Sequence, residues 1–173
     1  NKMQTISASK QSVVQFKQAP LPFVGQKRMF LKHFETILNE NIKCDGEGWT
    51  IIDTFGGSGL LSHAAKAIKP KARVIYNDFD GYAERLVHID DINALRSQLF
   101  TAAGNATPKN KRMPKELKAE CVKIIQAFDG YKDLNCLASW LLFSGQQVAT
   151  IDELFQNDFW HCIRQSDYPK ADC

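Results

Sequence analysis

The residues best suited to chemistry lie in a glycine-rich segment, Asp53-Thr54-Phe55-Gly56-Gly57-Ser58-Gly59, between an apolar segment and a helical pattern. Glycines there let the backbone turn tightly and approach a ligand closely, while the following helix offers unpaired N–H groups. A carboxylate at Asp53 would repel a pyrophosphate bound in the same turn. It suits instead a ligand that carries a cationic amino group and no phosphate, and S-adenosylmethionine is such a ligand.

A second acid lies where such a ligand would place its ribose. Asp78 follows the next apolar segment, 25 residues after Asp53. This is close to the offset of about 20 residues at which an acidic side chain reaches the ribose hydroxyls of an adenine nucleoside. Two carboxylates and a glycine turn therefore predict one pocket for adenosine. A glycine-rich turn that binds no ligand is the alternative.

A strand–helix–strand unit is needed to position these side chains. Short β-branched segments predict strands at 49–53 and 73–77, each buried on both faces, with a helix over 58–68 between them. Two strands joined in this way lie parallel, with a right-handed crossover. A preceding helix is expected from residue 27 to about residue 43, because apolar residues recur there at intervals of three and four.

Only helical patterns follow residue 80. They predict helices at 82–103, 114–128, 134–143 and 151–163, the last begun by a capping box of Thr150 and Glu153. Residues 104–112 are predicted to form a mobile loop, since no apolar residue there is large enough to hold it. Trp140 and Phe143, at helical spacing, are expected in the core. The chain thus divides into an α/β part at 1–85, an all-helical part at 86–165 and a loop at 166–173.

Composition excludes several classes of protein. The chain has 173 residues, of which 44% are hydrophobic, as in ordinary globular domains, and no segment approaches the ~18 consecutive apolar residues of a membrane span. Five cysteines without a C-x-x-C spacing argue against a secreted disulfide framework and a zinc knuckle, and favour the cytoplasm. The four histidines are scattered, so no metal site is predicted.

The charge pattern points to one basic segment. The net charge of +3 is small, but residues 105–128 hold six Lys or Arg and two acidic residues. Lys109, Lys111 and Arg112 would suit contacts with the phosphates of DNA. A solvated loop and helix face explains the same residues equally well.

Three segments resemble, in order, motifs of the Dam-type adenine-specific DNA methyltransferases. Pro22-Phe23-Val24-Gly25-Gln26-Lys27-Arg28 is similar to their N-terminal motif, an aromatic residue followed by Ala-Gly-Gly-Lys. The glycine-rich segment resembles their acid-Pro-Phe-x-Gly-x-Gly motif, and residues 74–80 resemble their second-strand segment. Gln26 and Thr54 stand where the family often has Gly and Pro.

This resemblance implies a fold, an activity and a set of site residues. The fold would be a partial Rossmann-like S-adenosylmethionine-dependent methyltransferase fold with an all-helical insertion. The activity would be methylation of the exocyclic amino group of adenine in double-stranded DNA, in a phage, prophage or restriction-modification setting. Phe23 and Lys27 would cover the methionine end of the cofactor, and Asp78 would hold the ribose. The residues implied to line the turn are Asp53, Phe55, Gly57 and Gly59.

The motif that holds the flipped adenine in this family is absent. The family uses an Asp-Pro-Pro-Tyr type motif after a later strand, and the six prolines here include no Pro-Pro pair. Asp167-Tyr168-Pro169 is interpreted as a loop, because no apolar strand precedes it. We therefore expect the N-terminal part of a longer enzyme, inactive as a 173-residue chain, with no catalytic residue assigned. The incomplete sheet predicts a third strand at 12–16 and self-association through the remaining edge.

Two other functions remain open. A methyltransferase that acts on RNA or on a small molecule would share the pocket but would not need the basic segment, so salt-dependent DNA binding separates it from the first function. A non-enzymatic helical binding module would not bind S-adenosylmethionine at all.

Overall fold

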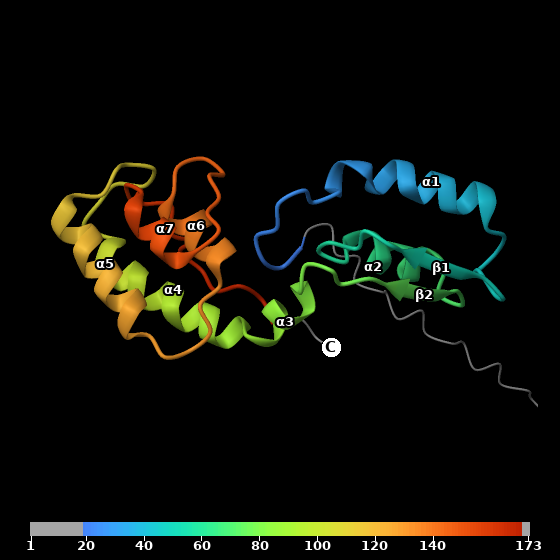
Figure 1. Ribbon diagram of the computed structural model, residues 1–173. Coiled ribbons are helices and arrows are strands. Elements are labelled where there is room, and N and C mark those ends of the chain that lie inside the picture. Colours follow the sequence, from blue (N-terminus) through green and yellow to red (C-terminus); the bar gives the residue numbers. More distant parts are fainter. Residues whose placement is uncertain (1–18, 171–173) are drawn as a thin grey trace, which may run out of the picture.

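The computed structural model describes residues 19–170, which form two parts joined by helix α3 (Tyr82–Val87) (Figure 1). A two-stranded sheet and its helices make up the α/β part, and the remaining helices gather on the other side of α3. The mixed α/β class predicted from the sequence is confirmed, whereas the domain boundary near residue 85 stays a prediction. In the described range, no helix combines the length and the apolar character that crossing a membrane requires.

The strand–helix–strand unit is present. Strands β1 (Thr50–Asp53) and β2 (Arg73–Tyr76) are paired in parallel, with Asp53 opposite Tyr76. Helix α2 (Leu60–Ile68) connects them. Parallel strands place their carboxyl ends at the same edge of the sheet, which is where ligands bind in open α/β folds. The segments that follow β1 and β2 therefore meet at one edge.

Two helices cover one face of this sheet. Helix α1 (Leu31–Asn41) follows a single 3-10 turn, η1 (Arg28–Phe30), and packs against α2. A small core lies between the helices and the strands, formed by Leu38, Ile42 and Ala65 with Phe34, Ile51, Ile68 and Val74 packed against it.

The opposite face of the sheet is exposed, so the prediction that both strands are buried on both faces is wrong. Side chains alternate between the faces of a strand. Because Ile51 and Val74 pack toward the helices, Ile52 and Ile75 point away from them and are 60% and 37% exposed. No element of residues 19–170 covers that side. Met29 is also exposed, so the apolar face expected for the preceding helix is only partly buried. The strand predicted at 12–16 lies outside the described residues, and self-association stays a prediction.

The helical part contains α4 (Ile89–Ala103), α5 (Lys115–Ala127), α6 (Leu134–Leu141) and α7 (Ile151–Gln156). The single helix predicted at 82–103 is instead two, because the chain leaves helical geometry at His88 between α3 and α4. The helix predicted at 151–163 ends at Gln156.

The capping residues at the start of α7 behave as predicted in part. Thr150 accepts a hydrogen bond from the Glu153 amide at 3.1 Å. The Glu153 carboxylate in turn accepts one from the Ala149 amide at 2.7 Å. Both side chains therefore satisfy backbone donors at the beginning of the helix, but Glu153 reaches the Ala149 amide and not the amide of the N-cap Thr150, as a capping box would.

Residues 104–112 are held in place, contrary to the prediction that nothing there could hold a loop. The backbone pairs in antiparallel fashion with the segment after α7: the Asn110 amide donates to His161 O at 2.7 Å, and the His161 amide donates to Lys111 O at 2.8 Å. Thr107 and Met113 are buried. The sequence pattern missed this because the partner segment lies about 50 residues away in the chain.

The main core lies in the helical part. Its largest side chain is Trp140, which is 2% exposed and was expected there, whereas Phe143 is 55% exposed and was wrongly placed in the core. Trp140 donates a hydrogen bond to the Tyr168 hydroxyl at 2.9 Å, so the C-terminal segment is packed against the same core. Ala19 and Leu21 also belong to this cluster. The segment that precedes η1 therefore contacts the helical part.

Candidate functional site

A cavity of about 470 Å³ opens at the carboxyl edge of the sheet. Three segments enclose it: the loop before η1, the turn after β1 and the segment after β2. Its lining residues are Phe23, Val24, Gly25, Lys27, Thr54, Phe55, Gly56, Gly57, Asn77, Phe79 and Asp80. The volume lies within the range of small-molecule sites.

The glycine turn is shaped by the tyrosine at the end of β2. A Cβ atom on Gly56 would overlap the Tyr76 ring. The Tyr76 hydroxyl lies 2.6 Å from Gly57 O and 2.9 Å from Asp78 Oδ1, and both are acceptors. Burial, followed by the hydrogen bond to Asp78, raises the pKa of Tyr76 above its ordinary value, so the hydroxyl keeps its proton. Tyr76 thus holds the turn in place through its ring and its hydroxyl.

The loop before η1 closes over this turn. The Phe23 ring lies so near Gly57 that a Cβ added there would be 3.0 Å from Phe23 Cε1. Lys27 Nζ donates a hydrogen bond to Phe55 O at 2.9 Å. An ammonium group has three donors, and this contact uses one of them. Four residues predicted from the sequence are thus brought to one cavity, namely Phe23, Lys27, Phe55 and Gly57.

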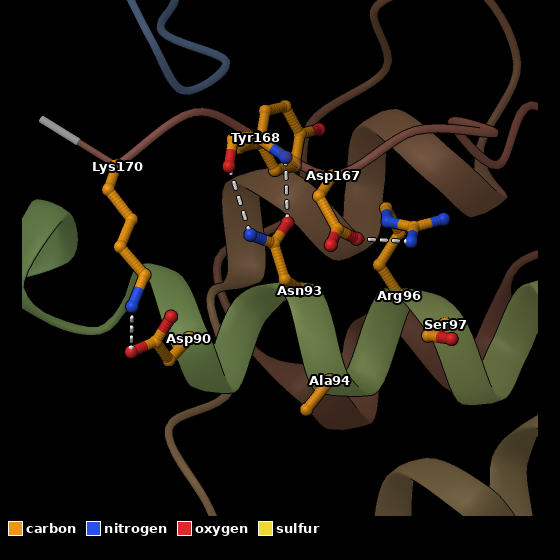
Figure 2. A pocket seen from close by; sticks show the side chains of 8 residues that line it. All are labelled: Asp90, Asn93, Ala94, Arg96, Ser97, Asp167, Tyr168 and Lys170. Atoms are coloured by element: carbon orange, nitrogen blue, oxygen red, sulfur yellow. Dashed lines mark hydrogen bonds and ion pairs between the residues drawn. The ribbon is translucent and has the colours of Figure 1, made fainter.

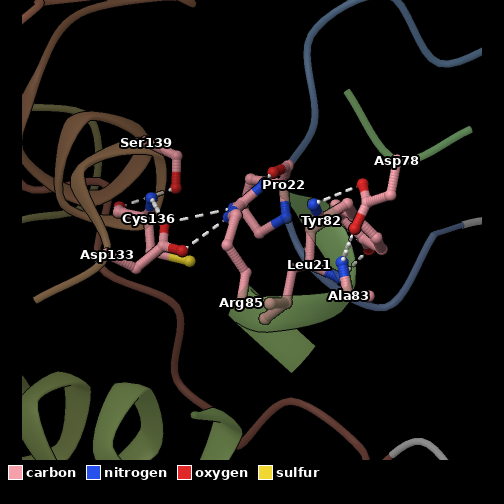
Figure 3. Close-up of polar contacts among 9 residues, drawn as sticks. All are labelled: Leu21, Pro22, Asp78, Tyr82, Ala83, Arg85, Asp133, Cys136 and Ser139. Atoms are coloured by element: carbon pink, nitrogen blue, oxygen red, sulfur yellow. Dashed lines mark hydrogen bonds and ion pairs between the residues drawn. The ribbon is translucent and has the colours of Figure 1, made fainter. Parts of the chain in front are cut away.

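The other three predicted residues do not line the cavity. Asp53 Oδ2 accepts a hydrogen bond from Ser62 Oγ at 2.7 Å, which ties the end of β1 to α2. Gly59 adopts the left-handed conformation, with φ 72°, immediately before α2. Asp78 Oδ1 accepts from the Tyr82 amide at 2.7 Å, and Oδ2 accepts from the Ala83 amide at 2.8 Å (Figure 3). These three residues shape the site without lining it.

The charge state of Asp78 follows from these contacts. Desolvation is the largest single influence on the pKa of Asp78 and raises it, but the hydrogen bonds from Ala83, Tyr76 and Tyr82 together lower it below the ordinary value. Asp78 is therefore an ionised carboxylate at the start of α3, where the helix dipole favours negative charge.

Sequence reasoning assigned no role to several residues that line the cavity. Phe79 and Asp80 directly follow the predicted ribose acid, and their side chains are exposed, with Phe79 89% exposed. Phe55 is 81% exposed. Two bare aromatic faces and a carboxylate at one opening suit a flat, hydroxyl-bearing ligand. The signal for Asp80 was its place two residues after Asp78, at the end of the segment 74–80.

The basic residues proposed for nucleic acid lie elsewhere. Lys109 and Lys111 are exposed, while Arg112 Nη2 pairs with Asp158 Oδ1 at 2.7 Å. The segment between α4 and α5 that carries them lies at the end of the helical part away from the α/β part (Figure 1). The structure therefore does not bring these residues to the cavity.

A second hollow, of about 570 Å³, lies where the C-terminal segment crosses α4 (Figure 2). Its polar side chains pair with one another: Arg96 Nη2 with Asp167 Oδ1, and Lys170 Nζ with Asp90 Oδ2 at 2.9 Å. The Asn93 side chain donates a hydrogen bond to Tyr168 O and accepts one from the Tyr168 amide. These contacts hold the C-terminal segment on α4. Across residues 19–170, no group of three His, Cys, Asp or Glu side chains is placed to hold a metal ion.

Comparison with known proteins gives one informative relative. No family model and no solved structure matches the chain. A Haemophilus influenzae protein named "Putative methyltransferase" is 68% identical over 157 residues, which are 91% of this chain and 53% of that protein. The chain thus spans about half the length of this relative and is homologous to that part of it.

Proposed function

We propose that this chain carries the S-adenosylmethionine-binding part of a methyltransferase that modifies the exocyclic amino group of adenine in double-stranded DNA. The observation that carries the proposal is the cavity at the carboxyl edge of the sheet, where Phe23, Lys27 and Phe55 meet the glycine turn. The homologous Haemophilus influenzae protein bears a methyltransferase name and supports the general class of reaction. The choice of adenine in DNA rests on the resemblance of the three sequence motifs.

The lining residues fit the cofactor chemically. Gly57 has no side chain, and a Cβ at this position would crowd the Phe23 ring. The glycine backbone can therefore lie close to a ligand. The exposed rings of Phe55 and Phe79 can stack on an adenine, and Asp80 can accept hydrogen bonds from ribose hydroxyls. The remaining donors of Lys27 can hold a carboxylate. Asp78 contributes by keeping α3 and Tyr76 in place.

In this proposal the chain contributes binding and orientation. When bound, S-adenosylmethionine supplies an electrophilic methyl group. The loop with Phe23 and Lys27 would cover the methionine end and exclude water, and the glycine turn would hold the cofactor in a fixed direction. Positioning of this kind can supply a large share of a rate enhancement for direct in-line transfer.

Calorimetry with S-adenosylhomocysteine tests the assignment of the cavity. Phe79→Ala is expected to weaken binding about fivefold, because the substitution removes one stacking interaction of about 1 kcal/mol. Phe143→Ala is the matched control: Phe143 is also an exposed phenylalanine, but it does not line the cavity. Equal affinities in wild type and Phe79→Ala would remove the ring from the site. No binding by the wild-type chain would favour the non-enzymatic helical module.

The salt dependence of DNA binding tests the nucleic-acid part of the proposal. Replacing Lys109 and Lys111 with alanine is expected to reduce the slope of log affinity against log salt by about 0.9 for each phosphate that a lysine no longer neutralises. The control pair is Lys32 and Lys43, two exposed lysines in the α/β part. Unchanged slopes in both double variants would favour an RNA or small-molecule substrate.

A further inference from the structure

The wall of the cavity formed by residues 21–27 is held by α3 rather than by the sheet. The Leu21 amide donates to the Tyr82 hydroxyl at 3.0 Å, and that hydroxyl lies 3.3 Å from Leu21 O. The Phe23 ring packs edge-on against the Tyr82 ring, with centroids 5.6 Å apart. On the sheet side, by contrast, the described hydrogen bond to the glycine turn is the one from Lys27 to Phe55.

A buried arginine holds the middle of the same loop. Arg85 Nη2 donates to Pro22 O at 2.8 Å (Figure 3). Arg85 Nε and Nη2 also donate to the two carboxylate oxygens of Asp133, at 2.6 and 3.1 Å. The two side chains are only 6% and 2% exposed. Asp133 in turn accepts from the Cys136 amide at 2.7 Å and so caps α6.

A buried ion pair is a poor device for stability alone, because apolar residues of similar size often do as well. The bidentate fork does, however, fix the orientation of the guanidinium plane. At this place, that orientation directs one more N–H at the Pro22 carbonyl. The position of the loop is thereby tied to Asp133, which lies 48 residues after Arg85 at the start of α6.

We propose that Arg85 is a positioning residue that holds Phe23 over Gly57, and that through Asp133 the helical part sets how closely the cofactor cavity closes. The inference rests on the proposed function in that the ligand of the cavity is the cofactor. Arg85 holds Pro22, the residue next to Phe23, and the loop has a single described hydrogen bond to the turn, so loss of the Arg85 contact loosens Phe23 over Gly57. A change in the helical part would then alter cofactor affinity with no residue of that part touching the cofactor.

Arg96 provides a matched control. Its side chain is 6% exposed, as that of Arg85 is, and pairs with Asp167. It also donates to the backbone carbonyls of Arg164 and Gln165, so it likewise holds a loop. That loop lies on α4 and does not line the cavity. Loss of either guanidinium should therefore cost stability, but only one should affect the cavity.

The experiment compares Arg85→Gln, Asp133→Asn and Arg96→Gln with wild type by hydrogen exchange, thermal unfolding and calorimetry with S-adenosylhomocysteine. We expect all three variants to unfold at lower temperature. Only the Arg85 and Asp133 variants should show faster amide exchange across 21–27 and an affinity lower by about tenfold, measured where every variant is folded. The double variant should lose little more affinity than either single one, because both changes break the same link.

Two results would overturn the proposal: unchanged exchange across 21–27 in Arg85→Gln, or an equal affinity loss in Arg96→Gln. If Arg85→Gln does not fold, Arg85→Lys replaces it, because lysine keeps the charge but cannot form the bidentate fork. Amide exchange across 21–27 is then expected to be faster than in wild type, by a smaller factor. Amide hydrogen exchange across 21–27 measures how firmly the loop is held, and it needs no ligand. A wild-type chain that binds no S-adenosylhomocysteine therefore contradicts the proposed function and leaves the role of Arg85 to be decided by exchange.

Discussion

Gly56→Ala is expected to destabilise the chain by about 3 kcal/mol and to abolish measurable binding of S-adenosylhomocysteine. The added methyl group would overlap the Tyr76 ring and would lie 2.8 Å from Asn77 O. The ring cannot turn aside freely, because its hydroxyl lies between Gly57 O and Asp78. Moving the turn instead would displace Phe55 and Gly57 from the cavity wall. Denaturant unfolding and calorimetry measure the two effects separately.

Gly145→Ala separates this steric effect from the general cost of replacing a glycine. Gly145 has φ +75°, and a Cβ there would meet nothing within 4 Å. Its substitution should cost roughly 1–2 kcal/mol of backbone strain and should leave ligand binding unchanged. If Gly56→Ala binds the ligand as wild type does, the turn after β1 is not part of the binding site.

No methyl transfer above background is expected from the 173-residue chain, even where it binds S-adenosylhomocysteine. An enzyme that acts on a flipped base needs a stacking aromatic side chain and hydrogen-bonding groups at the reacting edge. Asp167 and Tyr168 come nearest to this in sequence, but both are engaged elsewhere. Asp167 pairs with Arg96, and the buried Tyr168 hydroxyl accepts from Trp140.

The measurement is incorporation of label from S-adenosylmethionine into DNA isolated from a strain without DNA methylation. The full-length Haemophilus influenzae relative, of which this chain spans about half, is the parallel sample. Turnover by the 173-residue chain would show that its catalytic residues were overlooked. In that case, loss of turnover in Asp167→Asn would identify the acid.

The strand–helix–strand unit and the outline of the cavity were determined by the sequence alone. The β-branched segments around Ile51 and Val74 and the glycines between them act over short range, through backbone freedom and local hydrogen bonds. The same holds for the capping residues Thr150 and Glu153, which satisfy donors within one turn. Four of seven predicted cofactor residues line the cavity. Phe55 and Gly57 do so because they follow β1, and a parallel pair brings the ends of its strands to one edge. Phe23 and Lys27 do so on a loop that α3 holds.

Only the tertiary structure decided which acid faces the cavity and what holds its wall. Asp78 and Asp80 are two residues apart, and the choice between them depends on the Tyr82 and Ala83 amides, which capture Asp78. The partner of Arg85 lies 48 residues away, and no local period encodes such a pairing. The exposure of Ile52 was also beyond the sequence pattern. A strand is buried on both faces only if another element packs on each side of it. A run of apolar residues does not show whether such elements are present.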